Sequence, residues 1–163
     1  MTGIVATSYG LNHNKAYAGM VADGELANIV SKLNAGDTTI KYGKGVFRNG
    51  ETNAELPSST SSAADFVGVA VRELNRSYAD GQVFGAVPHK DFSAITVGVI
   101  WVVAAEAVTL NAPAFVRTGA TGNGDFAMAE GAGATLAVAI PNAKFVSAGS
   151  AGDLVKLSIV VGG

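Results

Sequence analysis

The side chains that could carry out catalysis are few and lie far apart in this sequence. The only imidazoles are those of His13 and His89, and neither stands in a pattern that supplies a nucleophile and an orienting acid. His89 falls in the polar stretch PHKD, where a solvated loop histidine is the simpler interpretation. The chain has no cysteine, which excludes thiol catalysis, disulfides and zinc thiolate sites. The sequence therefore predicts no catalytic residues and no enzyme.

Three glycine-rich stretches have some features of catalytic or binding loops. Residues 148–152, AGSAG, lack the first glycine of a nucleophile elbow. Residues 119–124, GATGNG, and 131–135, GAGAT, have neither the lysine of a P-loop nor a strand-turn-helix setting. Asp125 and Glu130 lie near these glycines, but the spacing of a calcium-binding EF-hand is absent. We therefore expect turns here, without a cofactor or a metal ion.

Charge and hydropathy argue against nucleic-acid and membrane partners. The eleven basic residues are scattered singly and the formal net charge is -2, so no basic run could follow a phosphate backbone. The longest uncharged apolar tract, residues 92–105, is fourteen residues long, whereas a spanning helix needs about 20. The opening residues MTGIVATSYG lack the basic and apolar regions of a secretory signal, so we expect synthesis in the cytoplasm of the producing cell without export by that route.

The C-terminal half of the chain is unusually poor in charge. Only seven charged residues occur in the 72 from Phe92 to the end, and charge makes up 15% of the whole chain, against about a quarter in typical soluble domains. Val, Ile, Ala, Gly and Thr fill the same stretch. Such a surface is poorly suited to water alone, so we expect partner subunits to cover part of it. This favours an assembly component over a free-standing enzyme.

The N-terminal part of the chain contains the least regular segments. Residues 1–23 are predicted to form an arm, followed by a single β-rich domain over residues 24–163. Within residues 24–34, Leu26, Ile29, Val30 and Leu33 recur at helical spacing, which favours one short helix over an extended arm. Residues 49–64 are rich in Ser, Thr, Asn, Gly and Pro, so we expect a mobile surface loop there.

The rest of the sequence alternates strand and turn patterns. Apolar alternation predicts strands at residues 38–47 (with a bend at Gly43 to Gly45), 66–71, 82–87, 97–104, 136–140 and 155–161, and GNGD at 122–125 predicts a hairpin tip. In residues 97–104 both faces are apolar, which indicates a strand buried on two sides or covered by another subunit. The expected fold is mainly β, an antiparallel β-sandwich or barrel with an N-terminal arm and one short helix.

Several segments resemble one known family. These are FVGVAVRE at 66–73, YADGQVFGAV at 78–87 and VGVIWVVAAEAV at 97–108, with AYAGMVAD at 16–23 and AKFVSAGSAGDLVKL at 143–157. In this order they are similar to the structural cement, or capsid decoration, proteins of tailed bacteriophages. The polar segment 49–64 has no counterpart that we can place.

The resemblance implies a structural protein that binds the outer surface of a phage head, commonly as a trimer, and clamps neighbouring capsomers of the major capsid protein. The location would then be the virion. We expect an oligomer or core interface at Phe66, Val99, Trp101 and Val103, and capsid contacts at Tyr9, Leu11, Tyr17 and Arg48. The alternative is a tail- or fibre-associated β module that recognises a host surface, although the lone Trp101 lies in an apolar strand and not in an exposed aromatic cluster.

Overall fold

The computed structural model describes residues 16–24, 26–74 and 82–161, and the regular elements of this part of the chain are strands joined by turns and loops. The strands are β1 (Asn28–Asn34), β2 (Ile40–Lys41), β3 (Gly45–Arg48), β4 (Asn53–Glu55), β5 (Phe66–Ala70), β6 (Gly85–Ala86), β7 (Asp91–Val103), β8 (Pro113–Arg117), β9 (Phe126–Ala127), β10 (Ala137–Phe145) and β11 (Leu154–Val160). Two 3₁₀ turns, η1 (Ala63–Asp65) and η2 (Gly133–Thr135), complete the described elements. The expectation of a mainly β fold is confirmed.

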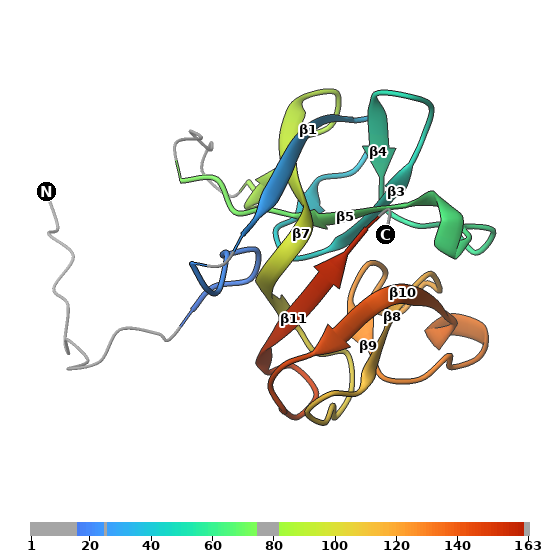
Figure 1. Ribbon diagram of the computed structural model, residues 1–163. Helices are drawn as coiled ribbons and strands as arrows, with labels where there is room; N and C mark the ends of the chain where they lie inside the picture. The colour runs from blue at the N-terminus through green and yellow to red at the C-terminus, as the bar shows by residue number, and fades with distance from the viewer. Residues whose placement is uncertain (1–15, 25, 75–81, 162–163) are drawn as a thin grey trace, which may run out of the picture.

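Five strands close into a barrel in the upper part of Figure 1. They follow the order β1, β4, β3, β5 and β7, and β1 pairs with β7 to complete the ring. The pairing of β1 with β4 is parallel and the other pairings are antiparallel. The barrel is therefore mixed, not purely antiparallel as the sequence pattern suggested.

Beyond the barrel, β7 continues the same nine-stranded sheet into the lower part of Figure 1, and we call this extension the second sheet. There it pairs with β11 from Val97 to Val103, and β10, β8 and β9 follow in order. A bridge between Ala104 and Phe126 brings β9 back to the end of β7. The thirteen residues of β7 thus serve both halves of the molecule.

Two apolar clusters fill the interior. Phe92 and Ala94 of β7 point into the barrel, where they join a cluster that includes Ile40, Val46 and Val67. Ile100 and Val102 belong to a larger cluster, which lies between the barrel strands β3 and β5 and the second sheet. Because both clusters draw on β7, the two halves share one continuous framework.

Gly68 of β5 allows the barrel to close tightly. Its φ of +153° favours glycine, and a Cβ at this position would overlap the carbonyl oxygen of Ile95 on β7. The neighbouring residue Val69 is the registered partner of Ile95. A side chain at residue 68 would therefore force the two barrel strands apart.

The prediction of a short helix over residues 24–34 is wrong. Residues 28–34 form strand β1, which pairs with β7 and β4. Of the residues at helical spacing, Leu26 is 86% exposed, and Ile29 and Leu33 are also largely exposed. Only Val30 packs against the barrel cluster, so the spacing did not mark a core-facing helical stripe.

The outcome differs among the other predicted segments. The strand expected over residues 82–87 is reduced to β6, which pairs with β2, and the segment 49–64 contains β4 and η1. The hairpin tip at residues 122–125 joins β8 to β9 as expected. No helix in the described part of the chain has the length and apolarity needed to cross a bilayer.

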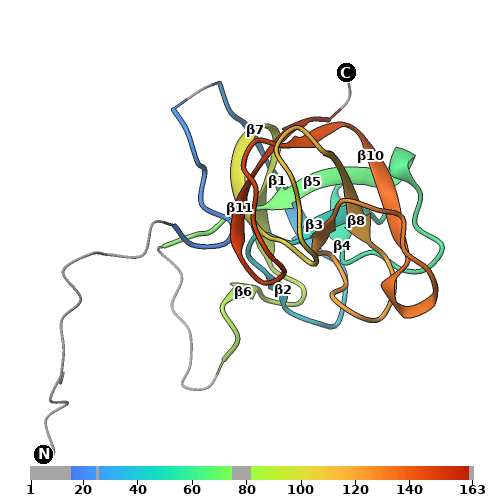
Figure 2. The ribbon, with the colours of Figure 1, turned by 90° about the horizontal axis from the view of Figure 1, so that it is seen from below.

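Residues 16–24 lie on the outer side of β7 and β11 in Figure 2. Gly19 donates its N–H to the carbonyl of Trp101 at 2.7 Å, and Ala22 donates to the carbonyl of Val99 at 2.8 Å. Ile100 pairs with Val21 on one edge of β7 and with Leu157 of β11 on the other. This part of the predicted arm is therefore attached to the sheet, whereas residues 1–15 lie outside the described residues.

Candidate functional site

Three of the residues predicted for an interface lie on one face of β7. Val99, Trp101 and Val103 alternate with the core residues Ile100 and Val102. Val99 is only 6% exposed, whereas Trp101 and Val103 are half-buried. Burial on both faces of β7, expected from the sequence, is therefore incomplete within one chain, because this face is only partly covered.

Trp101 and Val103 line a surface hollow together with Tyr17. The hollow has a volume of about 590 Å³, and Asp153 and Leu154 also line it. We call the surface of Tyr17, Trp101, Val103 and Leu154 the Trp101 face. The residues that the sequence assigned separately to oligomer and capsid contacts, Trp101 and Tyr17, thus meet on one surface.

Two cations hold the aromatic rings of the Trp101 face in place. The guanidinium of Arg72 lies 4.5 Å from the centre of the Tyr17 ring, and the ammonium of Lys156 lies 5.5 Å from the centre of the Trp101 ring. Lys156 also forms an ion pair with Asp23 at 2.9 Å. Both cations lie within the distance at which an aromatic ring attracts a positive charge.

The apolar surface continues past Tyr17. A second hollow of about 330 Å³ is lined by Tyr17, Met20, Val21, Val71, Arg72 and Leu74. Leu74 is 86% exposed and Tyr17 is 47% exposed. Large exposed apolar side chains grouped in this way are typical of surfaces that another protein covers.

Phe66 and Arg48, the other two predicted residues in the described chain, meet at a different place. Phe66 is buried and packs edge-on against Phe47, with 5.5 Å between the ring centres. Arg48 ends β3 and is exposed. Both residues line a hollow of about 270 Å³ beside β10 and β11. Phe66 therefore packs in the core and also contributes to the lining of this hollow.

That hollow adjoins a second one of about 390 Å³, since Asn142 and Val160 line both. Lys144 lines the second hollow. We call the combined depression the β10–β11 groove and define it by Arg48, Phe66, Ile140, Asn142, Lys144 and Val160. The predicted contacts Tyr9 and Leu11 lie outside the described residues.

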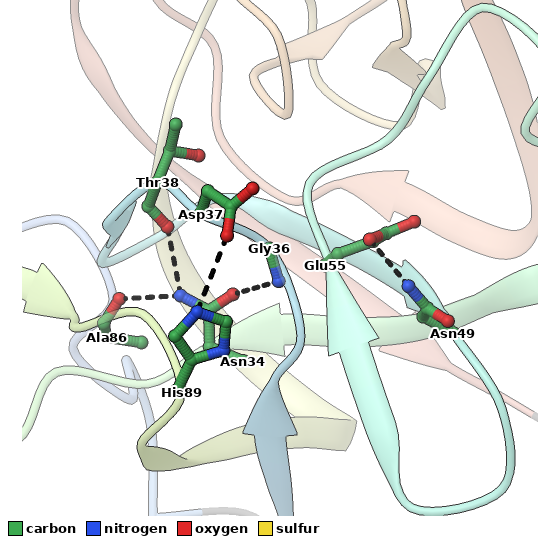
Figure 3. Close-up of polar contacts among 8 residues, drawn as sticks. All are labelled: Asn34, Gly36, Asp37, Thr38, Asn49, Glu55, Ala86 and His89. Carbon is green, nitrogen blue, oxygen red and sulfur yellow. Dashed lines mark hydrogen bonds and ion pairs between the residues drawn. The ribbon is translucent and has the colours of Figure 1, made fainter.

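The polar cluster around Asn34 has a structural role (Figure 3). The buried amide of Asn34 donates to the carbonyl oxygens of Thr38 and Ala86, each at 3.0 Å, and its side-chain oxygen accepts from the N–H of Gly36. His89 is largely exposed and lies 3.4 Å from a carboxylate oxygen of Asp37. His89 is thus a loop histidine with one acidic neighbour and no nucleophile among these contacts.

Within the described ranges, no three side chains of the His, Cys, Asp or Glu type gather closely enough to hold a metal ion. The polar residues near the glycine-rich turns are engaged in local structure. Glu106 accepts hydrogen bonds from the N–H groups of Met128 and Ala129, and Asp125 pairs with Lys44. These carboxylates thus serve local contacts in the described part of the chain.

Sequence reasoning missed the groove residues Asn142, Lys144 and Val160. The alternation of residues 136–140 predicts a strand that ends at Pro141, but β10 continues through Pro141 to Phe145 with a change of register. The positive φ of Asn142, +58°, marks the irregularity. An Asn directly after a Pro inside an apolar pattern was the available signal for a bulge.

Comparisons with known proteins agree with this geometry. Residues 5–160 match the family described as structural cement protein (E217 gp24/Pam3 gp6). A chain of the capsid of Myoviridae phage XM1 has a similar fold, with a TM-score of 0.74 and 14% identity over 97% of this chain and 98% of that one. The N base of the head fiber gp8.5 of bacteriophage phi29 matches with a TM-score of 0.43 and 12% identity, over 81% of this chain and 94% of that one. No curated protein matches the sequence.

Proposed function

This chain belongs to the phage structural cement protein family, which makes it a non-enzymatic component of the virion capsid, and we propose that it binds the outer surface of the head and stabilises the shell by clamping neighbouring capsomers. The observation that carries the proposal is the family match over residues 5–160, nearly the whole chain. The apolar Trp101 face and the β10–β11 groove supply surfaces for two kinds of contact, one between copies and one with the shell.

The proposed oligomer is a trimer that buries Trp101, Val103 and Leu154 of the Trp101 face and leaves Tyr17 at the rim of the interface. Trp101 and Val103 are only half-buried in one chain, and the apolar surface extends from them to Leu74. Large aromatic side chains at the centre of an interface contribute most of its binding energy. Closed rotational symmetry would let each copy cover the same surface of its neighbour. Val99, on the same face of β7, would lie beneath this interface, and Phe66 would act as a core residue.

We assign contacts with the major capsid protein to Tyr9, Leu11, Tyr17 and Arg48. Tyr17 lies near the start of the described chain, beside Trp101. We propose that the preceding arm reaches from there to a neighbouring copy or to the shell. Arg48 lines the β10–β11 groove, where its exposed side chain is available to a partner.

The stabilising mechanism is additive. A protein that binds the intact shell, and not the separated subunits, stabilises the shell by an amount that grows with its concentration relative to the dissociation constant. At about a hundredfold excess this contribution is roughly 2.7 kcal/mol for each site. Repetition over a symmetric shell multiplies the effect, so individual contacts can be weak.

The direct test uses capsids that lack this protein. Adding the purified protein is expected to raise the temperature at which the capsids break down, and the gain is expected to saturate as the sites fill. Calorimetry or dye release from DNA-filled heads would measure it. Saturable binding without any change in breakdown temperature would contradict the clamping mechanism and favour a display or host-surface role.

A further inference from the structure

We propose that the β10–β11 groove is the docking site for an extended, acidic segment of the major capsid protein. This inference rests on the proposed function and adds to it the position of the contact and the chemistry of the partner. It follows from three features of the groove: an interrupted strand ladder, an apolar floor and two cations that have no ion-pair partner among the described residues.

The groove exists because β10 separates from β11. The two strands pair only at Lys144 with Ser158 and at Phe145 with Leu157. The pairing of β10 with β8 changes register between Ala139 and Lys144, in the stretch that contains Pro141. Proline has no N–H to donate, so the ladder cannot continue regularly through this stretch.

On the other side of the groove, β11 continues beyond its last partner in β10. Val161 donates its N–H to Thr96 of β7 at 2.8 Å, whereas the carbonyl of Lys156 accepts from Val146 on the β10 side. Backbone groups alternate along a strand, so those of Val160 point toward the groove. An added extended peptide could use such an edge for main-chain hydrogen bonds, as in strand addition to other sheets.

The groove floor is apolar and fixed. Phe66 and Ile140 are each 5% exposed, and Val160 is 42% exposed and forms one wall. This surface suits small apolar side chains on alternate positions of a bound strand. It is already formed in the single chain, so binding would cost little reorganisation here.

Arg48 lines the first hollow of the groove and Lys144 lines the second. Both side chains are exposed, and neither forms an ion pair with any described residue. None of the described residues that line the groove carries a carboxylate. Asp65, which follows the lining residue Ala64, accepts a hydrogen bond from Ser62 at 2.7 Å. The groove is therefore cationic on a chain whose net charge is -2, and it complements an acidic peptide.

Charge also argues against a segment of a second copy as the occupant. Residues 1–15, the longest stretch outside the described chain, contain no Asp or Glu and carry Lys15. This segment would bring no partner for Arg48 or Lys144. An acidic segment of the capsid protein satisfies both cations.

The first test reverses the charges of the two cations that line the groove, Arg48 and Lys144. We expect R48E/K144E to bind capsids about tenfold more weakly than the wild type, because two ion pairs become repulsions. The matched control is K90E, which reverses an exposed lysine outside the groove lining and is expected to bind within about twofold of the wild type. If the wild type binds and the double variant binds equally well, the groove assignment is wrong while the cement function stands.

A second test identifies the occupant directly. A photoreactive side chain introduced at Ala64, which is exposed and lines the groove, is expected to crosslink to an Asp- or Glu-containing segment of the major capsid protein. The same group at exposed Ala107 is the control and is expected to give no such product. A crosslink from residue 64 to another copy of this chain would overturn the proposal, whereas absence of any capsid binding by the wild type would instead reject the cement function.

Discussion

The ammonium of Lys44 lies 2.7 Å from a carboxylate oxygen of Asp125, and this ion pair joins the turn before β3 to the hairpin between β8 and β9. Lys44 also donates to the carbonyl of Asn123 at 2.9 Å. Less than a fifth of each charged side chain is exposed. The barrel and the second sheet are thus held together by a polar contact as well as by their shared strand.

Removing this contact is expected to destabilise the whole molecule. K44A leaves the carboxylate of Asp125 partly buried without its partner, so the free energy of unfolding should fall by about 1 to 3 kcal/mol. K41A removes an exposed lysine from the neighbouring strand β2 and should change it by less than about 0.5 kcal/mol. Urea denaturation would measure both, and equal midpoints would contradict a structural role for the pair.

G68A is expected to disturb closure of the barrel. The added methyl group would overlap the carbonyl of Ile95 in a backbone conformation that favours glycine, so the loss should exceed about 3 kcal/mol. The control is G50A, since Gly50 also has a positive φ but no atom lies within 4 Å of the place that its new methyl group would take. Its cost should be the conformational strain alone, about 1 kcal/mol. Thermal melting would compare the two, and similar losses would show that the close approach to β7 is unimportant.

The two asparagines of Figure 3 give a third matched pair. N34A leaves the carbonyls of Thr38 and Ala86 without their donor in the interior, so we expect a loss of about 2 to 4 kcal/mol. N49A removes only an exposed hydrogen bond to Glu55, 2.7 Å long, and should cost less than about 0.5 kcal/mol. Urea denaturation would measure both variants. If N34A unfolds at the same urea concentration as the wild type, other groups donate hydrogen bonds to these carbonyls.

W101A tests the proposed interface between copies. Because Trp101 is half-buried in the single chain, its removal should cost the isolated subunit about 2 kcal/mol, less than a core tryptophan. It should weaken the oligomer much more, since large aromatic residues dominate interfaces. Sedimentation velocity over a concentration series would show the dissociation. L33A, at an exposed position on β1, is the control, and an unchanged oligomer in W101A would remove this face from the interface.

Deletion of residues 1–14 tests the proposed arm. Core packing in the described chain begins at Ala16, which is 3% exposed, so the truncated protein should fold and form the same oligomer. Binding to capsids is expected to weaken because Tyr9 and Leu11 are lost. Co-sedimentation with capsids would measure this. Full binding by the truncated form would leave Arg48 and the β10–β11 groove as the principal contact.

The sequence alone determined the features that depend on neighbouring residues. The alternation of Val155, Leu157 and Ile159 marks β11 because all three face the core, and the glycines of residues 122–125 mark the turn that joins β8 to β9. Low charge in the C-terminal half pointed to an assembly component, and the order of the strand segments pointed to the cement family. Each of these signals depends on neighbouring residues, or on the composition and order of segments along the chain.

Only the tertiary structure decided how distant segments pair. Residues 28–34 are a strand because β7, far along the chain, offers an edge to Ile29 and Val30, and no local pattern records that edge. The separation of β10 from β11 depends in the same way on partners from distant parts of the chain. So does the placement of Arg48 and Lys144 in the lining of one groove. Strand pairing energy comes from non-local hydrogen bonds and burial, so a local apolar period such as that of Leu26 to Leu33 can suggest the wrong element.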